Sequence, residues 1–361
     1  MENLLVEFVD TEECAKRDIC FPDVYLTPQY GQLVQISDGG IWEMAILRFA
    51  DATTCYYAYL KRPIHIDGCL HGGQMFDLIS PYGYGGPWAQ GDISEDKWLE
   101  FRTLFVVAAR NKNYISEFIR FSPLLQNMQR LFISATEESV ITWFHQQTFS
   151  VDLKASSYLT HAGKRHKYAV NVARRQGFVF NVERGRGIRT CSLLAFKELY
   201  RGTMDRLDAA SYYHFTDEYY TTLIDLLQDR VTLCTIESKQ TVVAAGFFLE
   251  HSDFVHYHLS AANDEGRQYG ATDLMLHEIA RCAKERDFEI LHLGGGVKHG
   301  DGLFNFKKSV GRVKLDWSLG KSIFDLTKYK QLVQAKAAKL KVDVQDLKDT
   351  GHFPEYRAGL P

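Results

Sequence analysis

The stretch HLGGGVKHGDGLFNFKKSVG, from His292 to Gly311, places three glycines directly after a run that is typical of a buried strand. Glycine backbones can turn several N–H groups toward one point, and the start of a following helix adds free N–H groups and the positive end of its dipole. An anion therefore fits this position, with Gly294 and Gly295 as candidate backbone donors and Lys307 as a candidate cation. A tight strand-to-helix turn that binds nothing explains the glycines equally well, and the Gly-Lys-Ser/Thr of a Walker loop is absent.

A second candidate for anion binding is the basic stretch between Lys164 and Arg189. It holds eight lysines and arginines against one acid, Glu183, in a chain whose net charge is −3. Such a local excess can meet phosphate groups, and Arg174 and Arg175 are the candidate ligands. A solvated basic helix face is the alternative interpretation.

The segment SPYGYGGPW, residues 80–88, is unusually rich in aromatic residues and glycine for a linker. Tyrosines on a constrained loop often contact a ligand, because the ring stacks and the hydroxyl hydrogen-bonds. Tyr82, Tyr84 and Gly85 are therefore candidate substrate-binding residues. A packed surface loop is the alternative.

Histidines gather in the second half of the chain. His256 and His258 alternate on one expected strand, and with His292 and His299 they could form a zinc site. Histidines with satisfied hydrogen bonds in a core or groove are the commoner case, so no metal is expected.

These residues must be positioned by an α/β (α+β) arrangement whose element order occurs twice. The second half predicts strand, strand, loop, helix and strand over residues 241–251, 254–262, 263–271, 272–287 and 288–296. The first half repeats the order with strands at 41–49, 55–64 and 76–79, a helix from Ser94, and a strand at 114–121. Further helices are expected at 156–177, 194–208 and 326–342.

Length and composition favour a two-domain cytoplasmic protein. The chain has 361 residues, and its seven cysteines are scattered without any CxxC pair, which is typical of reduced thiols. The N-terminus carries acids where a signal peptide needs lysines, and no apolar run reaches the ~18 residues of a membrane span.

Four segments together resemble the Fem-like branch of the GNAT acyltransferase superfamily, most closely its polysaccharide-associated members. They are ISPYGYGGP (79–87), KRHKYAVNVARRQGF (164–178), FKELYRGTMDRLDAASYYHF (196–215), and the region from Tyr257 to Gly311. The resemblance implies two tandem GNAT-like domains, each with a mixed, largely antiparallel sheet flanked by helices. It predicts an acceptor-side domain at 1–150, a donor-side domain at 151–325 with the catalytic cleft between the two, and a C-terminal helix and tail at 326–361.

The same resemblance implies N-acyl transfer at the cytoplasmic face of the membrane or in the cytoplasm. The expected donor is acyl-CoA, such as acetyl-CoA, and the expected acceptor is the amine of a nucleotide- or lipid-linked amino sugar or other envelope precursor. An aminoacyl-tRNA donor acting on a peptidoglycan precursor is the alternative. A third interpretation is a degenerate GNAT protein that only binds a nucleotide-linked sugar or RNA.

The resemblance also implies roles for individual residues. The segment 264–276 is similar to the pyrophosphate loop of GNAT enzymes: Arg267 and Gly270 fit the pattern, and Thr272 departs from its final Gly or Ala. Backbone donors near Ser260 would face the developing oxyanion, with Lys307 as the nearby cation. The candidate proton acceptors are Tyr257, His258 and Asp77.

Overall fold

The chain folds into two compact units. The computed structural model describes residues 4–66, 73–127, 140–155 and 162–359. The first unit comprises Met1–Cys20, Tyr25–His145 and Trp317–Pro361, and the second comprises Phe21–Val24 and Gln146–Asp316. The resemblance predicted a donor-side domain at 151–325 and a C-terminal helix and tail at 326–361. In the structure the chain returns to the first unit from Trp317 onward, because its last strand and helices pack there.

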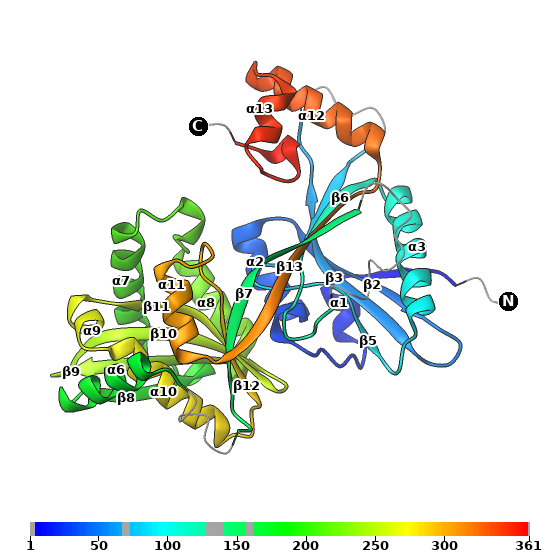
Figure 1. The fold of residues 1–361 in the computed structure, drawn as a ribbon. Helices are drawn as coiled ribbons and strands as arrows, with labels where there is room; N and C mark the ends of the chain where they lie inside the picture. The colour runs from blue at the N-terminus through cyan, green and yellow to red at the C-terminus, as the bar shows by residue number, and fades with distance from the viewer. Residues whose placement is uncertain (1–3, 67–72, 128–139, 156–161, 360–361) are drawn as a thin grey trace. The chain divides into compact units, whose positions relative to one another are not determined.

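The first unit contains every element that the sequence predicted for the first half (Figure 1). Its elements in chain order are β1 (Glu7–Val9), α1 (Thr11–Ala15), α2 (Pro28–Asp38), β2 (Ile41–Arg48), β3 (Thr54–Pro63), β4 (Phe76–Ile79), β5 (Trp88–Gln90), α3 (Glu95–Asn111), β6 (Tyr114–Arg120), the start of β7 (Val140–Asp152), most of β13 (Val313–Ile323), α12 (Leu326–Leu340) and α13 (Val344–Asp349). Ser94 caps α3, since its hydroxyl accepts a hydrogen bond from the Lys97 N–H at 3.4 Å.

The second unit adds elements that periodicity did not predict, notably two strands and a helix before residue 241. Its elements are α6 (Lys164–Arg175), β8 (Val179–Arg184), α7 (Thr190–Arg206), α8 (Asp217–Leu227), β9 (Val231–Ser238), β10 (Thr241–His251), β11 (Phe254–Ala262), α9 (Asp264–Gln268), α10 (Ala271–Lys284), β12 (Ile290–Gly294) and α11 (Gly302–Val310). The helix expected at 156–177 begins at Lys164, and residues 156–161 lie outside the described part. Within the described ranges, no helix is both long and apolar enough to cross a membrane.

Both units share one sheet topology. The first orders its strands β1-β2-β3-β4-β6-β13, and the second orders them β8-β9-β10-β11-β12-β7. In each unit the fourth and fifth strands pair in parallel, β4 with β6 and β11 with β12, and the other pairs are antiparallel. The predicted repeat of two mixed, largely antiparallel sheets is therefore confirmed.

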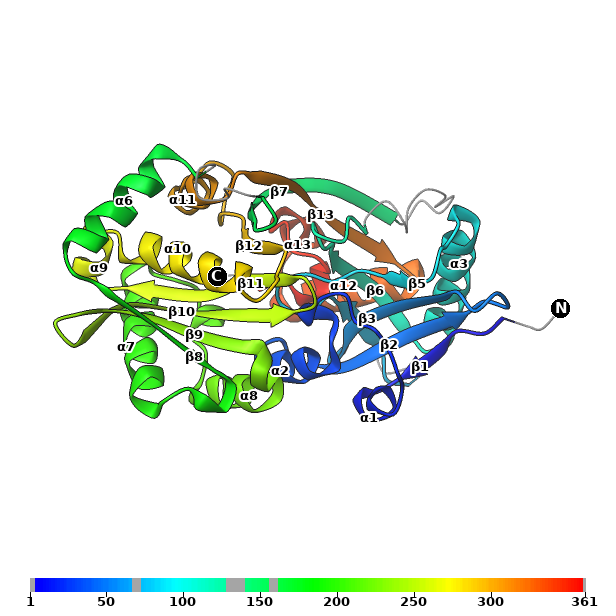
Figure 2. The ribbon, with the colours of Figure 1, turned by 90° about the horizontal axis from the view of Figure 1, so that it is seen from below.

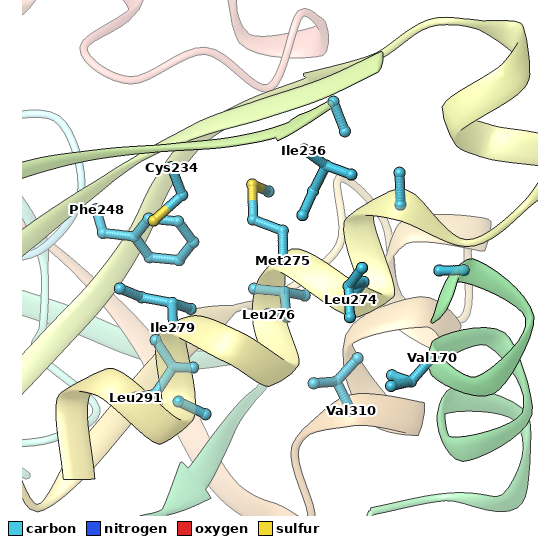
Figure 3. Close-up of a cluster of buried hydrophobic side chains, with 14 of the residues drawn as sticks. Val170, Cys234, Ile236, Phe248, Leu274, Met275, Leu276, Ile279, Leu291 and Val310 are labelled. Atoms are coloured by element: carbon cyan, nitrogen blue, oxygen red, sulfur yellow. The ribbon is translucent and has the colours of Figure 1, made fainter. Parts of the chain in front are cut away.

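Helices cover both faces of the second unit's sheet. Figure 2 shows α6, α10 and α11 on one side of the strands and α7 and α8 on the other. On the first side, side chains of α10 such as Met275 and Ile279 pack against Phe248 of β10, and Val310 of α11 joins them (Figure 3). On the other side, Phe247 contacts α7 and α8 through rings 4.7 and 6.3 Å away. Side chains thus pack on both faces of this sheet.

The first unit has a separate core on each face of its sheet. Trp98, Phe101 and Phe105 of α3 pack on one face. On the other face α12 and α13 (orange and red in Figure 1) bury side chains such as Leu332 and Leu347. The lysine-rich C-terminal helix is therefore amphipathic and packs by its apolar side.

Candidate functional site

The glycine run ends β12 and leads into α11. Gly294 has a φ of +74°, a left-handed conformation that suits glycine. The carboxylate of Asp301 then accepts hydrogen bonds from the N–H groups of Val297 and Lys298 at 2.8 Å each and of Phe304 at 2.6 Å. Burial raises the pKa of Asp301, but these backbone hydrogen bonds outweigh it and hold the pKa below its usual range. The anion on this turn is thus the chain's own carboxylate.

Asp301 was not among the predicted site residues, although a signal was present. An aspartate directly before an amphipathic helical run is a typical N-cap, and GDGLF offers one. By holding α11 to the loop, Asp301 fixes the position of the lysine two turns later.

Lys307 points from α11 back to the end of β12. Phe304 and Val310, each 4% exposed, anchor the helix. The ammonium of Lys307 donates a 2.8 Å hydrogen bond to the Gly295 carbonyl and lies 5.8 Å from the centre of the Tyr257 ring. Burial lowers the pKa of Lys307 to about 8, opposed by the Asp301 charge. Lys308, by contrast, is exposed.

The two parallel strands of the second unit, β11 and β12, separate beside Lys307. The ladder between β11 and β12 ends at the pair His256 and His292. In the first unit the equivalent ladder between β4 and β6 continues further, through Ile79 and Phe118 to a bridge between Gly85 and Phe121. Where two strands separate, their backbone donors and acceptors can face a ligand. The second unit, whose parallel strands separate earlier, is therefore the one that can bind a ligand between them.

A bulge in β11 arranges the side chains at this point. Two consecutive residues of β10 pair with Leu259 and Tyr257, so β11 has one extra residue there, His258. The shift brings Tyr257 and Ser260 to the same face, where their hydroxyl groups hydrogen-bond to each other. Burial raises the pKa of Tyr257 to about 12 despite the Ser260 hydrogen bond, so its hydroxyl keeps the proton near neutral pH. Tyr257 is therefore arranged as a hydrogen-bond donor.

His258 lies toward α7 and α8. Its Nε2 shares a 2.9 Å hydrogen bond with the hydroxyl of Tyr219 on α8. Burial, reinforced by His256, lowers the pKa of His258 to about 3, so the ring is neutral. Tyr219 was not predicted, because it comes from a helix 39 residues away that carries no local signal of this contact.

The four histidines considered for zinc do not converge. His256 and His292 are neighbours across the strand pair, with Nδ1 atoms 3.3 Å apart. His258 instead contacts Tyr219, and His299 lies over the ring of Phe304. No group of three or more potential metal ligands was found among the described residues.

The loop that resembles a pyrophosphate site forms α9 and the start of α10. Gly270, with a φ of +76°, precedes α10, whose first turn has no side-chain cap and includes Thr272. Uncapped N–H groups at a helix start attract phosphate. Arg267 donates to the Ala262 carbonyl at 2.8 Å and pairs with Asp264, so it braces the loop.

The basic helix α6 packs directly on this loop (Figure 2). A Cβ on Gly270 would lie 2.8 Å from the Ala169 carbonyl oxygen, which shows how closely the two backbones approach. His166 of α6 lies 2.8 Å from the buried carboxylate of Asp273 in the first turn of α10. α6 therefore forms one wall of the candidate donor site.

The two arginines predicted to bind phosphate differ in environment. Arg174 pairs with Glu278 of α10 at 2.9 Å, whereas Arg175 is exposed at the end of α6. α6 carries five lysines and arginines and no acid. Its outer face therefore presents positive charge.

Asp77, the remaining predicted proton acceptor, lies in the first unit. It is 1% exposed and pairs with both Arg62 and Arg357, so its carboxylate is engaged in a structural ion cluster. This environment does not favour a proton acceptor, because each carboxylate oxygen already accepts a hydrogen bond from a guanidinium group.

The SPYGYGGP loop, also in the first unit, is mostly packed. Tyr84 is 9% exposed and contacts the rings of Tyr25 and Trp317, and Gly85 is buried in the bridge to Phe121. Tyr82 is half-buried, and its backbone is held by Asp38 and Tyr30. For Tyr84 and Gly85 the structure therefore matches the packed-loop interpretation.

A comparison with known protein families finds a match within the second unit. Residues 163–308 match the acetyltransferase (GNAT) domain family. No curated protein matches the chain in sequence.

Solved structures show a similar fold over most of the chain. FemX aligns with a TM-score of 0.59 and 13% identity, covering 86% of this chain and 94% of FemX. L-PGS from Bacillus licheniformis aligns with a TM-score of 0.53 and 14% identity, covering 81% of this chain and 85% of L-PGS. The C-terminal domain (DUF2156) of a putative lysylphosphatidylglycerol synthetase from Agrobacterium fabrum aligns with a TM-score of 0.53 and 13% identity, covering 91% of this chain and 95% of that domain. At these identities the likeness concerns the fold.

Proposed function

We propose that this chain, an N-acyltransferase with a GNAT acetyltransferase domain, moves an acyl group from acyl-CoA to an amine of a cell-envelope precursor, such as a nucleotide- or lipid-linked amino sugar. The observation that carries the proposal is Lys307, whose ammonium lies at the point where β11 and β12 part. The Fem-like sequence segments support the acceptor class.

The parted strands can hold the reacting carbonyl. Amine attack on a thioester builds a tetrahedral oxyanion, which preorganised donors stabilise most in a partly buried site. In our proposal the β11 backbone from Tyr257 to Ser260 supplies N–H donors, and Lys307 supplies the positive charge. The neutral hydroxyl of Tyr257, next to Lys307, can protonate the leaving thiolate.

The donor's phosphates would lie at the start of α10. Its first turn has no side-chain cap, and Gly270 lets the chain enter the helix in a left-handed conformation. Thr272 offers an N–H group and a hydroxyl in this turn. These features support acyl-CoA, for which acetyl-CoA is the first donor to test.

One observation favours aminoacyl-tRNA as an alternative donor. The acid-free helix α6 packs against the start of α10, where it narrows the room for a pyrophosphate and faces outward with exposed cations. Such a face suits a nucleic-acid backbone. A third candidate, binding of a nucleotide-linked sugar or RNA without transfer, rests on the departure at Thr272.

Mass spectrometry of a nucleotide-linked amino sugar, incubated with the protein and either acetyl-CoA or charged tRNA, tests these candidates. Acylated sugar with acetyl-CoA is the expected product. Aminoacylated product with charged tRNA alone selects the alternative donor. Binding by calorimetry without product from either donor would refute the transferase assignment for this acceptor class.

The arginines at the end of α6 give a prediction about binding. Replacing Arg174 and Arg175 together by alanine is expected to weaken donor binding by about 1.5–3 kcal/mol for each charge-assisted hydrogen bond to phosphate that the change removes. Stability should change little, because the Arg174–Glu278 pair is exposed on the arginine side and such pairs contribute about 0–1 kcal/mol. Arg206→Ala, an exposed arginine in the last turn of α7, is the matched control. Calorimetric affinity that equals the control's would contradict a phosphate role.

A further inference from the structure

The three glycines after β12 are packed closely, each in its own way. Gly294 is the last residue of β12 that pairs with β7. A Cβ on Gly295 would lie 3.0 Å from Cδ of Gln146 and 3.1 Å from both polar atoms of its amide. A Cβ on Gly296 would lie 2.5 Å from Oδ1 of Asp301. The second and third glycines therefore make room for two side chains, Gln146 and Asp301.

Gln146 of β7 holds one peptide group of this turn. Its side chain is buried, at 2% exposed, and it belongs to the second unit, as the turn does. Its Nε2 donates a 2.8 Å hydrogen bond to the Gly296 carbonyl. The N–H of the same peptide group, which is that of Val297, donates to the Asp301 carboxylate at 2.8 Å. The Gly296–Val297 peptide group is therefore fixed on both sides, by Gln146 at its oxygen and by Asp301 at its nitrogen.

The preceding carbonyl, that of Gly295, is the one that accepts the hydrogen bond from the Lys307 ammonium at 2.8 Å. It lies between two fixed points, the end of the ladder with β7 at Gly294 and the peptide group that Gln146 holds. Glycine backbones reach many conformations, so a run of three glycines does not by itself keep a carbonyl in one place. The hydrogen bond from Gln146 restricts that freedom directly beside the partner of Lys307.

The Gln146 side chain uses only part of its hydrogen-bonding capacity. Its Oε1 atom is buried and has no hydrogen-bond partner in the part of the chain that the structure describes. A buried acceptor without a partner destabilises a fold, and an apolar side chain of the same length avoids that cost. Stability alone therefore gives little reason for a glutamine here, and its hydrogen bond to Gly296 points to a role in the site.

We propose that Gln146 is a positioning residue for the transfer reaction. By fixing the Gly296 carbonyl it keeps the Gly295 carbonyl in place, and through that carbonyl the Lys307 ammonium. The proposal rests on the proposed function, in which the charge of Lys307 stabilises the oxyanion. No atom of Gln146 has to touch the substrate in this role.

The expected consequence concerns the rate more than binding. An ammonium that is already in place when the oxyanion forms needs no reorganisation at that moment. If the Gly295 carbonyl moves, Lys307 loses its fixed position, and a displacement of about 1 Å can cost up to about 10²-fold in rate. Because the oxyanion exists only near the transition state, the loss falls on kcat and leaves KM nearly unchanged.

Gln146→Met tests the proposal in the full chain, because methionine has a similar length and no amide. With the donor and acceptor found active for the wild type, kcat is expected to fall about tenfold with KM nearly unchanged. The melting temperature should change little, since the variant loses one hydrogen bond and one unpaired buried acceptor together. Gln147→Met is the matched control: Gln147 is the next residue of β7, is half-buried, and faces the other side of the strand. Its kcat should equal that of the wild type.

A double-mutant cycle with Lys307→Ala separates positioning from a merely structural role. If Gln146 acts through Lys307, Gln146→Met should lower kcat in the wild-type background and cause no further fall in the Lys307→Ala background. A Gln146→Met variant within about twofold of wild-type kcat would overturn the proposal, and so would equal falls in the two backgrounds. If Gln146→Met does not fold, Gln146→Glu, which keeps the shape and loses the N–H donor, decides by the same two comparisons.

These outcomes are separate from those of the proposed function. Wild-type protein that forms no product refutes the transferase proposal, and the role of Gln146 with it. Active wild-type protein that loses rate in Lys307→Ala and keeps it in Gln146→Met refutes the role of Gln146 alone.

Discussion

Lys307→Ala is expected to lower turnover about 10²-fold, the scale of losing one preorganised oxyanion partner. The Lys307 ammonium is partly buried, is held by the Gly295 carbonyl at 2.8 Å, and faces the parted strands. A charge fixed in such a site needs no reorganisation when the oxyanion forms, so its loss falls on kcat more than on KM. Steady-state kinetics with the donor identified above measure the effect.

Lys308 offers a matched control one residue away. Its side chain is exposed, so Lys308→Ala should leave kcat and KM nearly unchanged. Lys307→Arg should rescue only part of the rate, because a planar guanidinium does not replace a compact ammonium. Comparable rates for the two alanine variants would show that Lys307 has no catalytic role.

The pH dependence follows from the depressed pKa of Lys307. With a pKa of about 8, the ammonium is lost as pH rises through 8, and turnover that depends on its charge should fall in the same range. The arginine variant should lack this decline, since its guanidinium stays charged. The effect of pH on stability has the opposite sign. Burial disfavours the ammonium in the folded state, so the free-energy cost of burying it is fully present below pH 8 and fades as pH rises from 8 toward 10.5. Lys307→Ala should therefore not lower the melting temperature at neutral pH.

Local sequence patterns predicted the elements around the site well. The strands expected at 241–251 and 254–262 coincide with β10 and β11, because β-branched and aromatic residues are interrupted there only by a short polar turn. The anchoring of α11 by Phe304 and Val310 was likewise readable from helical spacing. The edge strand β8 was harder to predict, since most of its residues are half-buried and show no clear alternation of buried and exposed positions.

Contacts between distant residues were not predictable from spacing. Asp23 meets His256 across more than two hundred residues, and Tyr219 reaches His258 from another helix. The bulge at His258 changes which side chains share a face, and nothing in the sequence YHLSAA marks it. Asp77 had a suitable residue type for a base, but its two arginine partners come from β3 and the C-terminal tail. Ionisable groups acquire their roles from such long-range neighbours.

The largest expected effect on stability lies in the first unit, at the buried ion pair between Arg102 of α3 and Glu117 of β6. The side chains are 7% and 1% exposed. Ser322 of β13 and Tyr57 of β3 both donate hydrogen bonds to Glu117, and Arg102 donates to Ser322 at 2.9 Å. One network thus connects a helix to three strands.

Arg102→Ala is expected to lower the free energy of unfolding by about 3–5 kcal/mol, because it leaves the Glu117 carboxylate buried without its cation. Urea unfolding measures the loss. Arg17→Ala is the control, since it removes an ion pair with Glu7 whose side chains are 24% and 48% exposed, and should cost less than about 1 kcal/mol. Replacing Arg102 and Glu117 together by methionine should cost less than Arg102→Ala, because no charge is then stranded. Equal losses for Arg102→Ala and Arg17→Ala would show that water reaches Glu117, and that the network does not hold α3 to the sheet.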